Sequence, residues 1–108
     1  MVFNLKGTNI ELTDAISQYV DKKLKTLNEN FQNIIRMSVE VGLTSKRHQN
    51  GTIYRAEVNV SIPGKMLRAE HTDSDLYRAI DHIQYEIKRE LKSAKEKQIK
   101  LRRKVVKV

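Results

Sequence analysis

Two stretches in the middle of the chain alternate between apolar and polar side chains. In the first, Ile35, Met37, Val39, Val41 and Leu43 alternate with Arg36, Ser38, Glu40 and Thr44. In the second, Tyr54, Ala56, Val58, Val60 and Ile62 alternate with Arg55, Glu57, Asn59 and Ser61. Because successive side chains of a strand point to opposite faces, both stretches predict strands with one buried and one solvated face.

Turn residues predict where these strands begin and end. Residues 45–52 are polar and contain Asn50-Gly51, which predicts a hairpin connection longer than a minimal turn. Pro63-Gly64 predicts a second reversal, after which residues 65–72 predict a weaker strand. Near the N-terminus, residues 2–6 alternate and meet Gly7-Thr8-Asn9, so they predict a further strand that these turn residues end.

Two other stretches have the three- and four-residue spacing of amphipathic helices. Thr13 can cap the first, whose apolar positions are Ile16, Tyr19, Val20, Leu24 and Leu27. We expect this helix to end near Asn28 or Asn30, with Phe31 folding back onto the core. Asp73-Ser74-Asp75 supplies a cap and negative charge for the second helix. Its apolar stripe is Leu76, Ala79, Ile80, Ile83, Ile87, Leu91 and Ala94.

The predicted elements define an α+β fold in the order strand, helix, strand, strand, strand, helix (β-α-β-β-β-α). Both helices can lie on the apolar face of one four-stranded sheet. A chain of 108 residues can bury one core, so we expect one domain over residues 1–95. Residues 96–108 then form a basic C-terminal extension, either as helix that projects from the body or as a frayed tail.

The positive charge of the chain is concentrated at its C-terminal end. The formal net charge is +8, and residues 1–87 contain 11 basic and 11 acidic residues. Residues 88–108 therefore carry all of the excess. Such an excess favours a polyanionic partner, with nucleic acid as the first candidate and an anionic membrane as the second. The sequence contains no membrane-spanning apolar run and no signal-peptide pattern, so we expect a cytoplasmic protein.

The composition and spacing of reactive residues argue against catalysis. Cysteine is absent, which removes disulfides, thiol nucleophiles and thiolate zinc sites. The histidines, His48, His71 and His82, have no metal-binding spacing, and no glycine-rich phosphate loop is present. We therefore expect no enzyme, no cofactor, no metal and no small-molecule substrate.

One face of the last predicted helix is basic. At about 100° per residue, Arg78, His82, Tyr85, Arg89 and Lys92 fall within one arc opposite the apolar stripe, with Lys88 on its flank. No acidic residue enters this arc before Glu96. Basic side chains neutralise phosphates and Tyr85 can stack on an exposed base, which suits irregular RNA better than duplex DNA. The alternative is a helix face that is merely solvated.

Lysines of the first helix provide a second candidate surface. Lys22 and Lys25 point away from its apolar stripe and, with Lys23, can form a patch beside the first. The alternative is that these lysines only increase solubility, and the same alternative holds for Lys46, Arg47 and His48 in the hairpin connection.

The element order and several sequence blocks resemble the ribosome hibernation promoting factor family, which includes ribosome-associated inhibitors and the so-called sigma-factor modulation proteins. The resemblance extends from Leu5 to about Lys97. The blocks that carry it are residues 7–13 (GTNIELT), Tyr19-Val20 with Lys23-Leu24 and Leu27, residues 75–81 (DLYRAID) and residues 87–91 (IKREL). The block over residues 75–81, continued by residues 87–91, is the most specific.

The resemblance implies a domain similar to a double-stranded-RNA-binding fold that sits on the small ribosomal subunit at the decoding region. There the family contacts ribosomal RNA through both helices and blocks the positions of messenger and transfer RNA. Carried over by position, the residues expected to contact phosphates are Lys23, Arg78, Lys88, Arg89, Lys92 and Lys95.

The chain departs from the family pattern at Glu86 and Ser93, where many members carry lysine. Long members append a second domain that pairs ribosomes. No part of this sequence resembles that domain, so the chain is a short member or the N-terminal part of a long one. Two other functions remain open, a generic module for structured RNA without ribosome preference and a protein-interaction adaptor.

Overall fold

The computed structural model describes the backbone of residues 1–44 and 51–106 and the side chains of this part up to residue 97. The strands are β1 (Val2–Thr8), β2 (Arg36–Leu43), β3 (Tyr54–Ile62) and β4 (Lys65–Asp73). The helical segments are α1 (Asp14–Val20), the π-helical turn η1 (Asp21–Lys25), α2 (Leu27–Asn30) and α3 (Leu76–Val106). Because α1, η1 and α2 follow one another closely, the predicted β-α-β-β-β-α order is confirmed.

The four strands form one sheet in the order β1-β2-β3-β4. β1 runs parallel to β2, and the other neighbours are antiparallel. β1 extends past its predicted end at Lys6, because Gly7 and Thr8 still pair with Val41 and Gly42. A Cβ atom on Gly42 would lie 2.1 Å from the carbonyl oxygen of Thr8. Glycine at this position therefore permits the close approach of the two strands.

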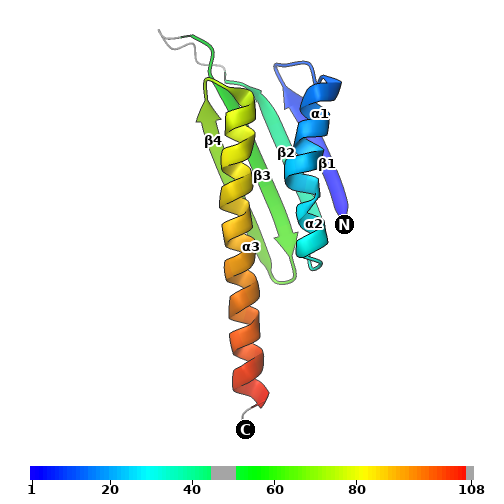
Figure 1. The fold of residues 1–108 in the computed structure, drawn as a ribbon, viewed down its shortest axis with the longest axis vertical. Coiled ribbons are helices and arrows are strands. Elements are labelled where there is room, and N and C mark those ends of the chain that lie inside the picture. Colours follow the sequence, from blue (N-terminus) through cyan, green and yellow to red (C-terminus); the bar gives the residue numbers. More distant parts are fainter. Residues whose placement is uncertain (45–50, 107–108) are drawn as a thin grey trace.

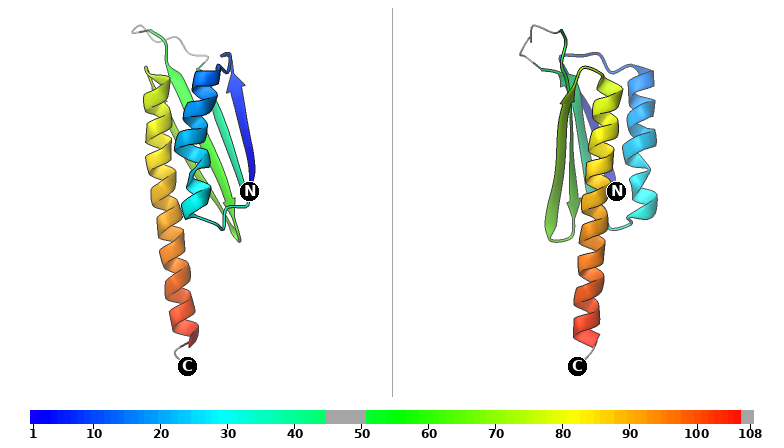
Figure 2. Two further views of the ribbon diagram at one scale, coloured as in Figure 1. Left: turned by 45° about the vertical axis from the view of Figure 1, so that its right-hand side comes forward. Right: turned by 60° about the vertical axis from the view of Figure 1, so that its left-hand side comes forward.

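The helices cover one face of the sheet. Figure 1 shows α1 and α2 in front of β1 and β2, with α3 in front of β3 and β4, and Figure 2 shows the two layers from the side. All seven residues of the predicted α3 stripe are buried, as are Val20, Leu24 and Leu27 from the first helical segment. Ile35, which we predicted to face the core, is instead 53% exposed and lies one residue before β2 begins at Arg36.

The first helical segment begins and ends as predicted but is not a uniform α-helix. The Thr13 hydroxyl accepts a hydrogen bond from the Ile16 amide at 3.2 Å, and the segment ends at Asn30. Phe31 packs into the core and is 6% exposed. The π-helical turn η1 was not predicted. It lies where three lysines surround the fully buried Leu24.

Helix α3 is the longest element. One oxygen of the Asp75 carboxylate accepts hydrogen bonds from the amides of Tyr77 at 2.9 Å and Arg78 at 3.4 Å, which confirms the predicted cap. The helix then continues without a break to Val106, and the last of its described buried residues is Ala94. We expected the end of the chain to be either a projecting helix or a frayed tail, and the backbone up to Val106 is helical. The side chains from residue 98 onward, and the hairpin residues Lys46, Arg47 and His48, lie outside the described residues.

The other face of the sheet is solvated and carries a network of paired charges. Arg55 contacts Glu57 and Glu70, and Arg68 contacts the same two carboxylates, at distances of 2.5 to 2.8 Å. Burial raises the pKa of Glu57, but hydrogen bonds from Arg68 and Asn59 outweigh it, so the pKa is lowered overall. The hydrogen bond from Arg55 lowers the pKa of Glu70. Within this network every charge has a partner of opposite sign.

Candidate nucleic-acid interface

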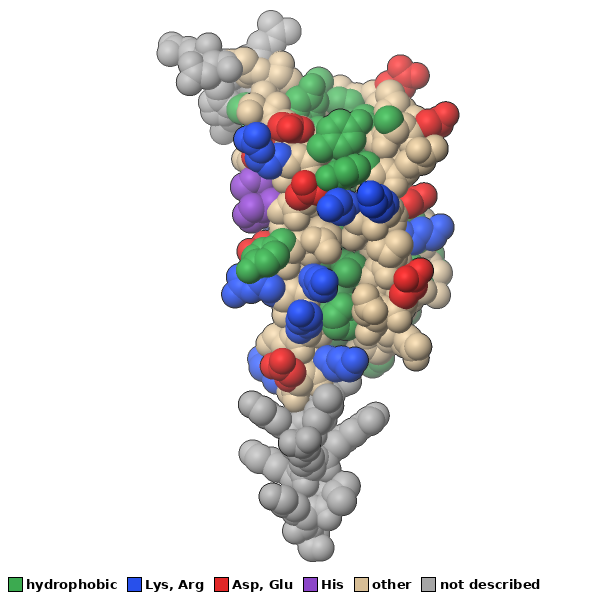
Figure 3. Space-filling view, in the orientation of Figure 1, with side chains coloured by type: hydrophobic (Ala, Val, Ile, Leu, Met, Phe, Trp, Pro, Cys, Tyr) green, Lys and Arg blue, Asp and Glu red, His purple; other side chains and the backbone are tan. Residues whose placement is uncertain are grey.

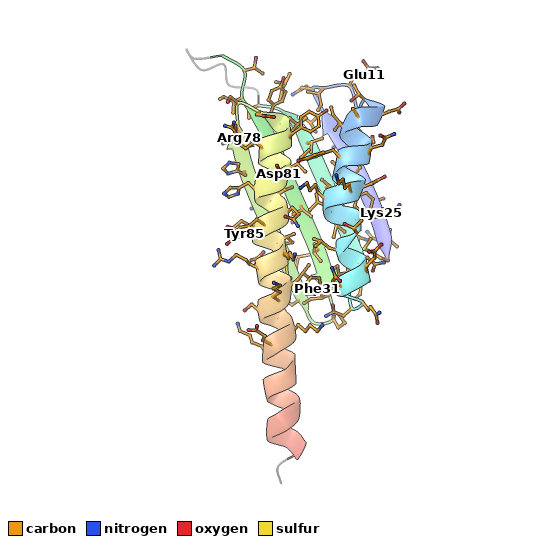
Figure 4. The ribbon with its side chains drawn as sticks, in the orientation of Figure 1. Glu11, Lys25, Phe31, Arg78, Asp81 and Tyr85 are labelled. Atoms are coloured by element: carbon orange, nitrogen blue, oxygen red, sulfur yellow. The ribbon has the colours of Figure 1, made fainter. Side chains whose placement is uncertain are left out.

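The polar residues of α3 form two rows on different sides of the helix. Asp81, Lys88 and Lys95 are seven residues apart and therefore lie on one side. That side faces the first helical segment, because Asp81 contacts Lys23 of η1 and the Lys95 ammonium lies 5.9 Å from the ring centroid of Phe31. Figure 4 shows Asp81 on this side of α3, with Arg78 and Tyr85 on the other.

We define the inner row as Lys88, Lys92 and Lys95, whose four- and three-residue spacing places them in one line along α3. Lys92 and Lys95 are exposed and Lys88 is half-buried. None of the three pairs with a carboxylate among the described side chains. The inner row is therefore a line of uncompensated positive charge held on a rigid helix.

A polar junction joins the upper end of this side of α3 to the first helical segment. The Tyr19 hydroxyl donates a hydrogen bond to Asp81 at 2.5 Å, and the Lys23 ammonium lies 3.6 Å from the same carboxylate oxygen. This hydrogen bond raises the pKa of Tyr19 to about 12. The Tyr19 ring also meets Tyr77 edge to face, with centroids 4.9 Å apart. These contacts fix Lys23 beside α3, at the end of the helix opposite the inner row.

The outer row of α3 is Arg78, His82, Tyr85 and Arg89, on the side of β4. Arg78 lies 3.7 Å from Asp73, and Arg89 lies 3.6 Å from Glu86. Two arginines of the predicted arc therefore have acidic neighbours that lie outside the arc, Asp73 in β4 and Glu86 on the flank of α3. A hydrogen bond from the Asp75 amide, reinforced by the charge of Arg78, lowers the pKa of Asp73. Both arginines of the outer row are thus partly neutralised by carboxylates, which the helical projection alone did not predict.

Two ring contacts shape the outer row. His82 stacks on His71 of β4, with centroids 3.7 Å apart and planes 10° from parallel. Tyr85 is 61% exposed, and the Arg89 guanidinium lies 5.8 Å from its centroid. Tyr85 therefore keeps a surface on which a base can stack.

The described residues include no group of three or more histidines, cysteines or carboxylates that could hold a metal ion.

The structure does not bring all lysines of the first helical segment to α3. Lys25 lies 5.7 Å from the ring centroid of Phe3 in β1, so it is on the side of η1 away from α3 (Figure 4). Lys22 and Lys25 line the same shallow depression with Asn28 and Glu29. Only Lys23 joins the α3 surface, while Lys22 and Lys25 form a separate patch.

Figure 3 views the molecule from the helical side and shows how charge is distributed over it. Lys and Arg side chains gather over the middle of α3, whereas hydrophobic and acidic side chains gather at the upper end. The residues that sequence reasoning missed, Tyr19, His71 and Asp81, act through contacts between elements. Tyr19 and Asp81 are 62 positions apart, and no local pattern connects them.

The fold and the basic helical surface together define a small β-α-β-β-β-α domain of the kind that the sequence resemblance implied. The chain belongs to the Sigma 54 modulation protein / S30EA ribosomal protein family, whose model matches residues 3–99.

Two curated relatives carry the name ribosome hibernation promotion factor. The protein from Lactococcus lactis is 35% identical over 95 residues, which cover 86% of this chain and 49% of the relative. The protein from Deinococcus radiodurans is 32% identical over 101 residues, which cover 94% of this chain and 52% of the relative. The chain thus spans about half the length of the curated relatives it matches.

Two solved structures have the same fold. The N-terminal domain of Protein Y from Thermus thermophilus is 36% identical, with a TM-score of 0.70 over 85% of this chain and 96% of that one. A ribosomal subunit interface protein from Coxiella burnetii is 18% identical, with a TM-score of 0.75 over 89% of this chain and 99% of that one. The second likeness concerns the fold alone.

Proposed function

We propose that this protein is a ribosome hibernation factor that binds ribosomal RNA of the small subunit with its helical surface. The single observation that carries the proposal is the inner row of α3, whose lysines have no carboxylate partner among the described side chains. The names of the curated relatives support the hibernation role. Ribosomes are cytoplasmic, so the protein acts in the cytoplasm, and no helix in the described part of the chain could cross a membrane.

The inner row fits phosphates for a simple physical reason. Lysines that have no internal partner lose no ion pair when they meet a phosphate, and the counterions that they displace favour binding. Lys23 lies on the neighbouring element but is 3.6 Å from Asp81, so it would exchange this contact for a phosphate, and exposed Tyr85 offers a ring to an unpaired base. We place the bound protein at the decoding region, where it blocks messenger and transfer RNA and so inhibits translation without any chemical reaction.

Co-sedimentation with salt-washed small subunits tests this proposal. We expect the natural chain to sediment with the subunit near physiological salt and a Lys92→Gln, Lys95→Gln variant to bind about tenfold more weakly. The matched control is Lys6→Gln, Arg36→Gln, which removes the same charge from exposed residues on the outer face of the sheet. Binding that fell equally in both variants would reject the inner row as the contact surface.

Competition and footprinting test the ribosomal part of the proposal. An arbitrary RNA duplex should displace the protein from the small subunit only at large excess, and equal affinity for both would favour a generic module for structured RNA. Chemical probing of the subunit should show protection of decoding-region nucleotides. Protection confined to another region would remove the proposed block of messenger and transfer RNA.

A further inference from the structure

A shallow apolar pocket opens at the upper end of the helical layer, away from the inner row. It has a volume of about 430 Å³ and is lined by Ile10, Ile16, Tyr54, Asp75, Leu76 and Tyr77, among others. These residues come from the β1–α1 connection, α1, β3 and the start of α3. The volume falls within the range of pockets that hold small ligands or single side chains of a partner.

The surroundings of this pocket have the opposite charge to the inner row. Of the four carboxylates in residues 73–87, Asp73, Asp81 and Glu86 each lie near a cation, whereas Asp75 on the pocket wall has none among the described side chains. Asp14, at the start of α1, and Glu11, in the preceding connection, are also exposed and have no cationic partner among the described side chains. Figure 3 shows exposed hydrophobic side chains at this end, with Asp and Glu around them and Lys or Arg side chains at their lower and left borders. Carboxylates without a cationic partner disfavour a phosphate backbone at the pocket itself, which is lined by none of the inner-row lysines.

Asp75 offers acceptor capacity on the wall of the pocket. Only one of its carboxylate oxygens is used, as the acceptor for the amides of Tyr77 and Arg78. The described part of the chain places no cation in an ion pair with Asp75. Because an ionised carboxylate can accept about four hydrogen bonds, Asp75 can cap α3 and bind a cationic donor at the same time.

Tyr77 supplies an aromatic surface beside this carboxylate. Its ring packs edge to face against Tyr19, and 39% of the residue remains exposed. An arginine side chain has an apolar stem, a planar cation that stacks on aromatic rings, and donors that match a carboxylate. The apolar wall, the ring of Tyr77 and the carboxylate of Asp75 are the complements of these three parts.

We propose that this pocket is a docking site for an arginine-bearing peptide segment of a protein partner. The guanidinium group would contact Asp75 and Tyr77, and the stem or a neighbouring aliphatic side chain would contact Ile10 and Ile16. The carboxylates around the pocket add long-range attraction for a basic segment. This site is separate from the RNA contacts of the inner row and can be tested without ribosomes.

Titrations of the full chain with short peptides, followed by NMR, test the proposal. The probes are a capped Gly-Arg-Leu-Arg-Gly peptide and its counterpart with citrulline, an uncharged isostere, in place of arginine. We expect the arginine peptide to shift the amide signals of Ile16 and Tyr77 saturably and to bind about fivefold more tightly than the citrulline peptide. The absence of saturable shifts at these residues, or equal affinity for both peptides, would overturn the proposal.

Substitutions separate the pocket from general charge effects. Asp75→Asn keeps a good N-cap but removes the carboxylate, so we expect about fivefold weaker binding of the arginine peptide with an unchanged spectrum elsewhere. Asp14→Asn makes the same charge change at the same end but outside the pocket lining, so it should remove only long-range attraction and weaken binding by less than about twofold. If the two variants bind the peptide equally, Asp75 is not the contact and the proposal fails.

Two further measurements address the aromatic contact and the competing occupant. Tyr77→Leu keeps the wall apolar but removes the ring, and it should weaken the arginine peptide more than the citrulline peptide. Adenosine, an uncharged nucleoside, should not shift the pocket residues at the concentrations that saturate the peptide. Tighter binding of adenosine than of the arginine peptide would show that the pocket receives a nucleobase instead.

Discussion

The outer face of the sheet and the inner row of α3 both carry several charged side chains, but the partners of these charges differ. On the sheet, Arg55 and Arg68 each contact both Glu57 and Glu70. On α3, the inner row has no carboxylate partner among the described side chains. Charge that is already paired must break its contacts before it can bind anything else. The number of charged residues on a face is therefore a poorer guide to binding than their pairing.

The strongest expected difference is in the response to salt. If the three lysines of the inner row and Lys23 contact phosphates, affinity for the small subunit should fall about 100-fold between about 50 and 200 mM salt. The unfolding free energy should change far less over this range, since close pairs in the sheet network are only weakly screened. Sedimentation and urea unfolding at matched salt concentrations measure the two quantities. Affinity that stayed constant would favour a protein-interaction adaptor.

The second prediction breaks the sheet network. Glu57→Gln leaves Arg55 and Arg68 with one carboxylate fewer and should lower the unfolding free energy by about 1–2 kcal/mol. Binding to the small subunit should not change, because Glu57 lies on the face opposite the inner row. Urea unfolding and sedimentation check both statements. A loss of binding without a loss of stability would place the interface on the sheet.

The third prediction concerns acid. The pKa values of Glu57 and Glu70 are lowered by the network, so the stability they contribute is present above their unfolded pKa and is lost as pH falls through the folded value. Urea unfolding between about pH 7 and pH 3 should show this loss below the ordinary glutamate value of 4.5. The difference between the natural chain and Glu57→Gln should shrink over the same range. A constant difference would mean that Glu57 stays ionised throughout.

The smallest expected effect comes from giving the inner row a partner. Gln84→Glu places a carboxylate four residues before Lys88, which should stabilise the helix by about 0.3 kcal/mol and weaken subunit binding about threefold. Asn4→Glu adds the same charge to the exposed outer face of β1 and should leave binding unchanged. Stability and affinity that moved in the same direction would contradict the idea that pairing removes binding capacity.

The sequence predicted those parts of the fold in which apolar residues recur at a short, regular spacing. The stripe from Leu76 to Ala94 and the alternation in β3 were correct, because burial of one face imposes a period on the residues. The cap at Asp75 was correct for a similarly local reason. Local patterns could not give the parallel pairing of β1 with β2 or the glycine that it requires at position 42, since both depend on distant residues.

The candidate site was predicted only in outline. Helical projection found the basic residues of α3 but merged two rows into one arc, because it cannot say on which side the first helical segment packs. The same limit hid the contacts of Asp81 with Tyr19 and Lys23. The sequence also grouped Lys25, which lies beside Phe3 of β1, with Lys23, which contacts Asp81 of α3. Charge and the spacing of apolar residues are properties of a single helix or strand, whereas a binding surface is formed by residues from several helices and strands.

The position of β1 has a consequence for the order of folding. β2, β3 and β4 pair with their chain neighbours, and α3 follows β4 directly, so most of the core can form from short-range contacts. β1 must instead cross the whole first helical segment before it can add to the edge of the sheet, which closes a long loop. We infer that β1 docks last and opens first. Its amide protons should exchange with solvent sooner than those of β3.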